Sequence, residues 1–117
     1  MGFPLKQVEI LGHTYTIVAD DSPTCLQHIQ PSPQYPDGCK GMIILDQQTI
    51  YLDRTLPPQQ LFQTFLHEIL HGIDYHLTKG SLFSNQADNE SVIEMLSIAL
   101  LQFFSNNDLI MVIKWMK

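Results

Sequence analysis

The chain has 117 residues, of which 44% are hydrophobic, and it carries a net charge of −6 at pH 7. This length predicts a single domain over residues 1–117, with one hydrophobic core and no separate lobe for binding a substrate, so an active site should lie in an open cleft. The six lysines and arginines are scattered singly, which excludes the basic stripe that a nucleic-acid partner requires.

The N-terminal segment does not have the pattern of a secretory signal. Met1–Leu5 contains Pro4 and leads into alternating polar residues instead of an apolar run. No segment approaches the roughly 20 apolar residues that a membrane-spanning helix needs. We therefore expect a cytoplasmic protein without a membrane partner.

Two pairs of strands are predicted in the first half of the chain. Hydrophobic residues alternate with polar residues on both sides of Gly12, which predicts a hairpin of about residues 5–10 and 13–19. A second pair is predicted at about residues 42–45 and 49–53. Together these strands should form a small antiparallel sheet. The alternating residues of the first hairpin are Val8, Ile10, Tyr15 and Ile17.

The segment 20–38 between the two strand pairs is rich in proline, serine, glutamine and aspartate. Its four prolines argue against any regular element, so we predict a surface loop that either borders the cleft or serves as a passive connector. The two cysteines, Cys25 and Cys39, imply no disulfide in a reducing compartment. Together with His28 they resemble part of a structural zinc site, but a closed site needs a fourth ligand, and none is nearby in the sequence.

A long amphipathic helix is predicted at about residues 56–78. Its apolar residues recur at steps of three and four, as expected for a stripe that faces a core. Thr55 is the expected N-cap, and Gly80 suits the end of the helix. Pro57 and Pro58 are tolerated only in its first turn. The apolar stripe consists of Leu61, Phe62, Phe65, Leu66, Ile69, Leu70, Ile73 and Leu77.

This helix carries the feature with the clearest chemistry, the pentapeptide from His67 to His71. Side chains four residues apart stand one turn apart on the same face of a helix, so the two histidines can grip one zinc ion together. Glu68 is rotated about a quarter turn from them, where it is poorly placed to ligate the ion but well placed to accept a proton from water. One helix thus predicts two metal ligands and a general base.

A third protein ligand is expected, because catalytic zinc is usually held by three side chains. Asp74 lies about a turn beyond the histidines and His76 points elsewhere, so neither easily closes a tetrahedral site; Asp74 stays a candidate for supporting a ligand. Glu90 and Glu94 share one face at the start of a second amphipathic helix, predicted at about residues 88–104. Its apolar residues are Val92, Ile93, Leu96, Ala99, Leu100, Phe103 and Phe104.

The segment Ser105–Asp108 reads as the end of that helix and the cap of a short C-terminal helix. The short helix is apolar on more than one side. We expect it to complete the core, although Trp115 and Met116 could instead dock a partner or a second copy of the chain.

The pentapeptide motif, followed by eighteen residues and then Glu90, resembles the gluzincin metallopeptidases, which include the thermolysin-like enzymes. Within this group, the small size and the runs Ile50–Asp53 and Thr64–His71 are most similar to the compact ImmA/IrrE-like and phage-encoded metallopeptidases. The resemblance spans about residues 42–104. It implies an α+β, zincin-like fold, in which a short sheet packs on the motif helix and on a following helix that bears a glutamate.

The resemblance also implies a function, a zinc-dependent endopeptidase acting on a protein or peptide substrate, which in phage and mobile-element members is a regulatory protein. It implies Zn²⁺ as the cofactor and Glu90 as the third ligand. An aspartate four residues later orients a ligand histidine in this group; this chain has the longer Glu94 there. In resembling enzymes the substrate lies extended along an edge strand above the motif helix, and residues 49–53 are our candidate for this strand.

The residue that stabilises the developing oxyanion is not determined by the motif. Tyr75, His76, Tyr51 and His28 all have suitable chemistry.

A function of a different class also stays open, a non-catalytic zinc-binding module for protein interaction, of phage or mobile-element origin. The intact Glu68 favours the enzyme, because a structural metal site needs no base between its ligands. In a third interpretation the histidines bind no metal and simply occupy a partly wet helix face.

Overall fold

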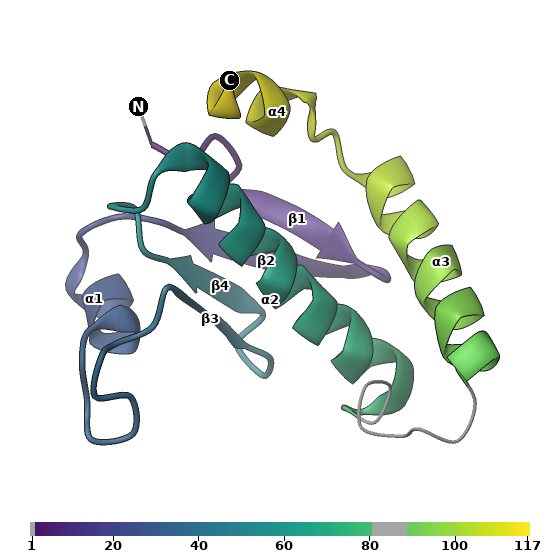
Figure 1. Cartoon of the computed structure of the whole chain (residues 1–117), viewed down its shortest axis with the longest axis horizontal. Coiled ribbons are helices and arrows are strands. Elements are labelled where there is room, and N and C mark those ends of the chain that lie inside the picture. Colours follow the sequence, from purple (N-terminus) through teal and green to yellow (C-terminus); the bar gives the residue numbers. More distant parts are fainter. Residues whose placement is uncertain (1, 81–88) are drawn as a thin grey trace.

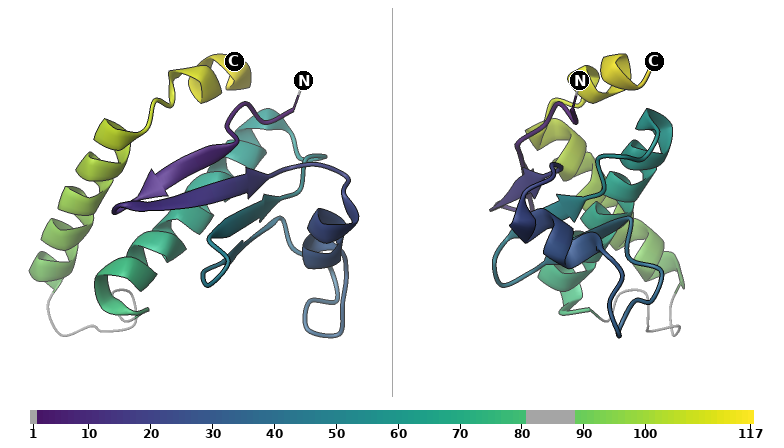
Figure 2. Two further views of the ribbon diagram at one scale, coloured as in Figure 1. Left: turned by 180° about the vertical axis from the view of Figure 1, so that it is seen from behind. Right: turned by 90° about the vertical axis from the view of Figure 1, so that its left-hand side faces the viewer.

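The computed structural model describes residues 2–80 and 89–117, with only the backbone described at 89–94 and 97. Within these residues four strands form one sheet, and the chain is of the α+β class. Helix α2 (Pro58–Thr78) lies across one face of the sheet, and helix α1 (Pro23–Ile29) packs on the other face (Figures 1 and 2).

Both predicted strand pairs are confirmed. Strands β1 (Gln7–Ile10) and β2 (His13–Val18) form the first antiparallel hairpin, and β3 (Gly41–Ile44) and β4 (Thr49–Leu52) form the second. The prediction of a wholly antiparallel sheet is wrong, because β2 and β4 pair in parallel. After β2 the chain forms α1 on one face of the sheet and then enters the second hairpin at β3. As a result, β4 runs in the same direction as β2.

The strand order β1-β2-β4-β3 places β4 in the interior of the sheet. Our expectation that residues 49–53 form an edge strand is therefore wrong, since β4 has a hydrogen-bonded partner on each side. Within the second hairpin, the edge strand is β3.

Helix α1 contradicts the prediction of an irregular segment at 20–38. The Oγ atom of Ser22 accepts a hydrogen bond from the backbone N–H of Cys25 (3.2 Å), and Pro23 occupies the first turn, where a missing N–H has no consequence. The later prolines follow the end of the helix. Buried Cys25 and Ile29 anchor α1 against Tyr51 on β4.

Helix α2 confirms the predicted motif helix and most of its apolar stripe, but Leu77, which was predicted to belong to the stripe, is 37% exposed. Its fully buried residues follow one another at steps of four and pack on the sheet; they are Leu61, Phe65, Ile69 and Ile73. The N-cap is Pro57, not Thr55 as predicted. The Thr55 hydroxyl instead donates to Asp53 Oδ1 (2.6 Å). At the other end Lys79 and Gly80 adopt φ of 58° and 93°, which ends the helix as expected.

Helices α3 (Asn89–Asn106) and α4 (Ile110–Met116) confirm the two predicted C-terminal helices. The break between them is stabilised by Asn107, whose side chain bonds the backbone N–H and C=O of Glu9 on β1 (both 2.8 Å). Trp115 packs edge-on against Phe3, with ring centroids 5.4 Å apart, and so contributes to the core as expected. None of the helices described combines the length and hydrophobicity that a bilayer crossing demands.

Close packing between β3 and α2 depends on Gly41. A Cβ atom at this position would lie 2.7 Å from Thr64 Cγ2 and 3.2 Å from the carbonyl oxygen of Tyr51. Neither neighbour can move easily, because one is a β-branched side chain on a helix and the other is backbone in the sheet. The absence of a side chain at Gly41 thus brings the edge strand against the motif helix.

We predict that Gly41→Ala lowers the free energy of unfolding by about 1–3 kcal/mol, the usual penalty for overpacking. Urea unfolding followed by circular dichroism measures this change. Gly2→Ala is the matched control, because a Cβ atom there meets nothing within 4 Å. An unchanged midpoint for Gly41→Ala would show that the strand and the helix are not tightly apposed.

Candidate metal and catalytic site

The two motif histidines converge at the surface of α2. Their Nε2 atoms lie 3.2 Å apart, with the ring planes at 72° to each other. Two nitrogens bound to one tetrahedral zinc at about 2.0–2.1 Å would be separated by about 3.3–3.4 Å. The pair formed by His67 and His71 therefore fits a shared zinc ion.

Glu68 lies between α2 and the edge strand β3, and only 6% of its surface is exposed. Burial raises the pKa of its carboxyl group above the ordinary value; His67, His71 and a backbone hydrogen bond from Ile43 act in the opposite direction. The carboxylate is thus held beside the two imidazoles and away from bulk water. A carboxylate with a raised pKa is a better proton acceptor than an ordinary glutamate.

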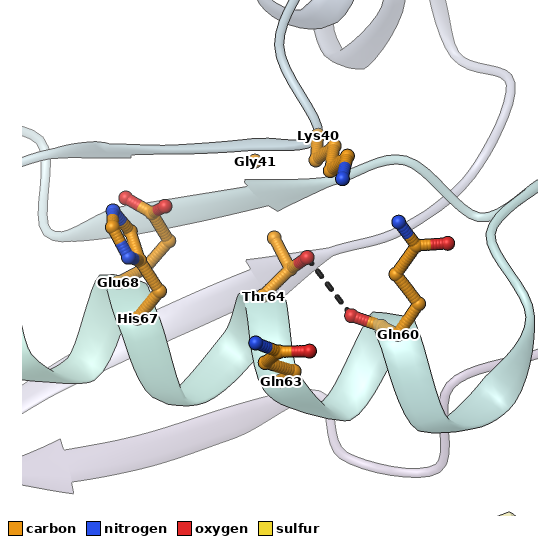
Figure 3. Close-up of a pocket in the computed structure, with 7 residues that line it drawn as sticks. All are labelled: Lys40, Gly41, Gln60, Gln63, Thr64, His67 and Glu68. Carbon is orange, nitrogen blue, oxygen red and sulfur yellow. Dashed lines mark hydrogen bonds between the residues drawn. The ribbon is translucent and has the colours of Figure 1, made fainter.

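A groove runs between β3 and α2, with the motif at its middle. It consists of two adjoining cavities of about 340 and 670 Å³, both lined by Gly41, His67 and Glu68. Figure 3 shows the smaller cavity, in which Glu68 points from the helix toward β3. The predicted open cleft is present, and it follows an exposed edge of the sheet.

The larger cavity also contains a residue from the segment after α1. Tyr35, which is 41% exposed, lines this cavity together with Met42 and Tyr75. Of the two roles considered for the segment 20–38, the structure thus favours a loop that borders the cleft.

Among the described side chains, those of residues 2–80, 95, 96 and 98–117, no three from histidine, cysteine, aspartate or glutamate gather around a common metal position. Asp74 lines the larger cavity, is 8% exposed and accepts a hydrogen bond from the Thr78 hydroxyl (2.9 Å), but it does not complete such a group. The alternative zinc set of Cys25, His28 and Cys39 does not gather either.

The predicted third ligand, Glu90, and its neighbour Glu94 begin helix α3, but their side chains lie outside the described residues. Among the described residues, the strand that α3 contacts most is β1, at the edge opposite to β3. The choice of third ligand therefore rests on the family resemblance alone.

Of the four side chains considered for oxyanion stabilisation, Tyr75 is the one that lines the groove. Tyr51 and His28 stack on each other on the α1 side of the sheet, with ring centroids 4.2 Å apart. His76 faces the first hairpin, where its Nε2 atom is 2.6 Å from the Tyr15 hydroxyl.

Sequence reasoning missed Tyr35, Lys40, Gln60 and Gln63 as groove residues. Gln60 and Gln63 precede His67 by seven and four residues, so helical spacing already predicts that they share its face. No local signal places Tyr35 or Lys40 there, because their position depends on how the loop and β3 pack against α2.

The comparisons of the chain with protein-family models, curated proteins and solved structures give no match.

His76 belongs to a separate cluster at the C-terminal end of α2. Its ring stacks on His13 at 3.9 Å between centroids. Burial, followed by the proximity of His13 and Lys79, lowers the pKa of His76 below its ordinary value of 6.5. At a pH between the two pKa values, His76 is therefore neutral in the folded chain and protonated in the unfolded chain.

We predict that acidification destabilises the wild type more than His76→Gln, which cannot titrate and can still accept a hydrogen bond from Tyr15. The stabilising contribution of neutral His76 is complete above its ordinary pKa of 6.5 and is lost as the pH falls through that value toward the lower folded pKa. Urea unfolding at several values between about pH 8 and pH 5 tests this. Parallel pH profiles for the two proteins would contradict the assignment.

Proposed function

We propose that this chain is a zinc-dependent metallo-endopeptidase of the gluzincin type, with a zincin-like relation between motif helix and edge strand. The observation that carries the proposal is the pair of imidazole Nε2 atoms 3.2 Å apart beside the buried Glu68. The groove that contains them follows the edge strand β3. A chance pattern on a solvent-exposed helix face would require neither the burial of this carboxylate nor a groove around it.

His67 and His71 would hold the zinc ion, with Glu90 as the third ligand that the family resemblance implies. Zinc, when bound, supplies Lewis-acid chemistry toward water and toward a peptide carbonyl at neutral pH. Asp74 and Glu94 are the candidates for orienting the ligand histidines through hydrogen bonds.

Glu68 is the proposed general base. Its carboxylate accepts a proton from the attacking water and delivers it to the amine nitrogen that leaves. This carboxylate is buried between β3 and α2, where the backbone of Ile43 opposes the rise in its pKa. We assign to Tyr75 the donation of a hydrogen bond to the carbonyl oxygen as charge develops on it.

The proposed substrate is an extended segment of a protein or peptide, and the family resemblance suggests a regulatory protein. An extended segment beside β3 can form backbone hydrogen bonds with the edge strand while its scissile bond lies over the motif. The structure supports β3 in this role in place of the β4 segment, because β4 is paired on both sides.

We predict that the purified chain binds one equivalent of zinc. His71→Ala should lose this zinc, because the substitution removes one of the two imidazoles that form the chelate. Zinc content after dialysis, measured by mass spectrometry of the metal, tests this. His28→Ala is the matched control and should retain zinc, because its ring lies on the other face of the sheet. Absence of zinc from the wild type would rule out the proposed site.

We further predict that Glu68→Gln keeps zinc but cleaves casein and a mixture of defined peptides at least about 100-fold more slowly, as expected on removing a general base. Cleavage products are identified by mass spectrometry. Full cleavage by Glu68→Gln would exclude Glu68 as the base. Zinc binding by a wild type that cleaves nothing would favour the interaction module.

The two glutamates of α3 should differ in their effect on zinc affinity. We predict that Glu90→Ala abolishes stable zinc binding, whereas Glu94→Ala weakens it by about 10- to 100-fold, as is typical for a residue that only orients a ligand. Competition with a chromophoric chelator gives both affinities. The reverse order would exchange the two roles.

A further inference from the structure

The smaller cavity extends the groove beyond His67 and is walled by polar side chains. Lys40 precedes the first residue of β3, while Gln60 and Gln63 come from the first two turns of α2. Figure 3 shows Lys40 on the β3 side of the groove and Gln60 on α2. The cavity has a volume of about 340 Å³, enough for a side chain of a peptide.

The ammonium group of Lys40 has no ion-pair partner among the described residues. Asp53 donates its backbone N–H to the Lys40 carbonyl oxygen (2.9 Å), but its carboxylate accepts hydrogen bonds from the backbone and hydroxyl of Thr55 (3.0 and 2.6 Å). Arg54 pairs with Asp21 instead (2.9 Å). Within the part of the chain that the structure describes, Lys40 thus lines the groove without an ion pair, and the carboxylate that shares its cavity is that of Glu68.

The opposite end of the groove has a mixed lining. Met42, Leu45 and Tyr75 line it together with charged side chains, among them Asp74 and Lys79. Its cation, Lys79, lies over the Tyr75 ring, with Nζ 4.8 Å from the centroid, and is therefore engaged by a cation–π contact. Among the described residues, Lys40 is thus the lysine of the groove that has neither an ion pair nor a cation–π contact.

We infer that the pocket formed by Lys40, Gln60 and Gln63 is a subsite for a carboxylate of the substrate. The ammonium group supplies the charge, and the side-chain amides supply neutral donors. This inference rests on the proposed peptidase function for its place in a substrate, but the pocket itself requires neither zinc nor catalysis.

Helix geometry gives the position of the carboxylate relative to the scissile bond. Gln63 and Gln60 precede His67 by four and seven residues, which corresponds to about 6 and 10 Å along the helix axis. An extended peptide advances about 3.3 Å per residue. The carboxylate should therefore lie about two or three residues from the cleaved bond, either as a glutamate or aspartate side chain or as a C-terminus.

Binding to the Glu68→Gln variant tests the subsite without consuming the peptide. The probes are fluorescent, N-acetylated, C-amidated, alanine-rich peptides in which one glutamate occupies each position in turn, with glutamine at the same position as the reference. We expect one position at which glutamate binds about two- to fivefold more tightly than glutamine, the effect typical of a partly exposed ion pair. The preference should persist in EDTA and weaken with added salt.

Substitutions at Lys40 assign the preference to this pocket. Lys40→Gln should abolish it, and Lys40→Glu should replace it with a preference for lysine at the same position. Lys79→Gln, at the other end of the groove, is the matched control and should leave it unchanged. A peptide with a free C-terminus, compared with its amide, distinguishes a terminal carboxylate from a side chain.

Retention of the glutamate preference in Lys40→Gln, or its absence from the parent protein, would overturn the inference. Cleavage by wild-type protein without any such preference would overturn the subsite and leave the peptidase intact. A preference that depends on Lys40, in a protein that cleaves none of these peptides, would establish the pocket and count against the peptidase.

Discussion

The burial of one carboxylate between a helix and an edge strand is the constraint on which the rest of this site depends. Removing an ionised carboxylate from water costs several kcal/mol unless charges and hydrogen bonds replace the lost hydration. Here the two motif imidazoles and the backbone N–H of Ile43 oppose the effect of burial on Glu68. The same packing that buries Glu68 leaves the imidazoles at the wall of the groove, where an ion and a substrate can reach them.

The two edge strands of the sheet are covered by different elements, and this difference explains where the groove lies. At β1 the Asn107 side chain bonds both backbone groups of Glu9, and α3 packs alongside (Figure 2). Among the described helices, the one that packs most closely beside β3 is the motif helix α2. The helix and the strand are in close contact at Gly41, and a groove lies between them along the rest of the strand. A peptide that adds to this sheet would therefore do so at β3.

Much of this arrangement can be predicted from local sequence patterns. Alternation around Gly12 indicates the first hairpin, and apolar steps of three and four indicate α2 and α3, because these periods follow directly from backbone geometry. The motif residues are placed on one helix by the same reasoning. Helix α1 also had a local signal, Ser22 followed by Pro23, but the prolines after Ile29 obscured it.

The features that could not be predicted depend on long-range pairing. Nothing within β4 indicates that β2 will pair with it in parallel, yet this pairing decides which strand is the edge. The side of the sheet that Tyr51 faces follows from register and from the position of α1, so its exclusion from the groove was not visible in the sequence. Lys40 and Tyr35 enter the groove through loop packing, for which a single sequence carries no periodic signal.

Zinc-edge X-ray absorption of the wild-type chain loaded with one equivalent of zinc tests the convergence of His67 and His71 on a single ion most directly. We predict scattering from two imidazole rings at about 2.0–2.1 Å, with oxygen completing the first coordination sphere. Scattering from sulfur at about 2.3 Å, or from fewer than two imidazoles, would contradict it.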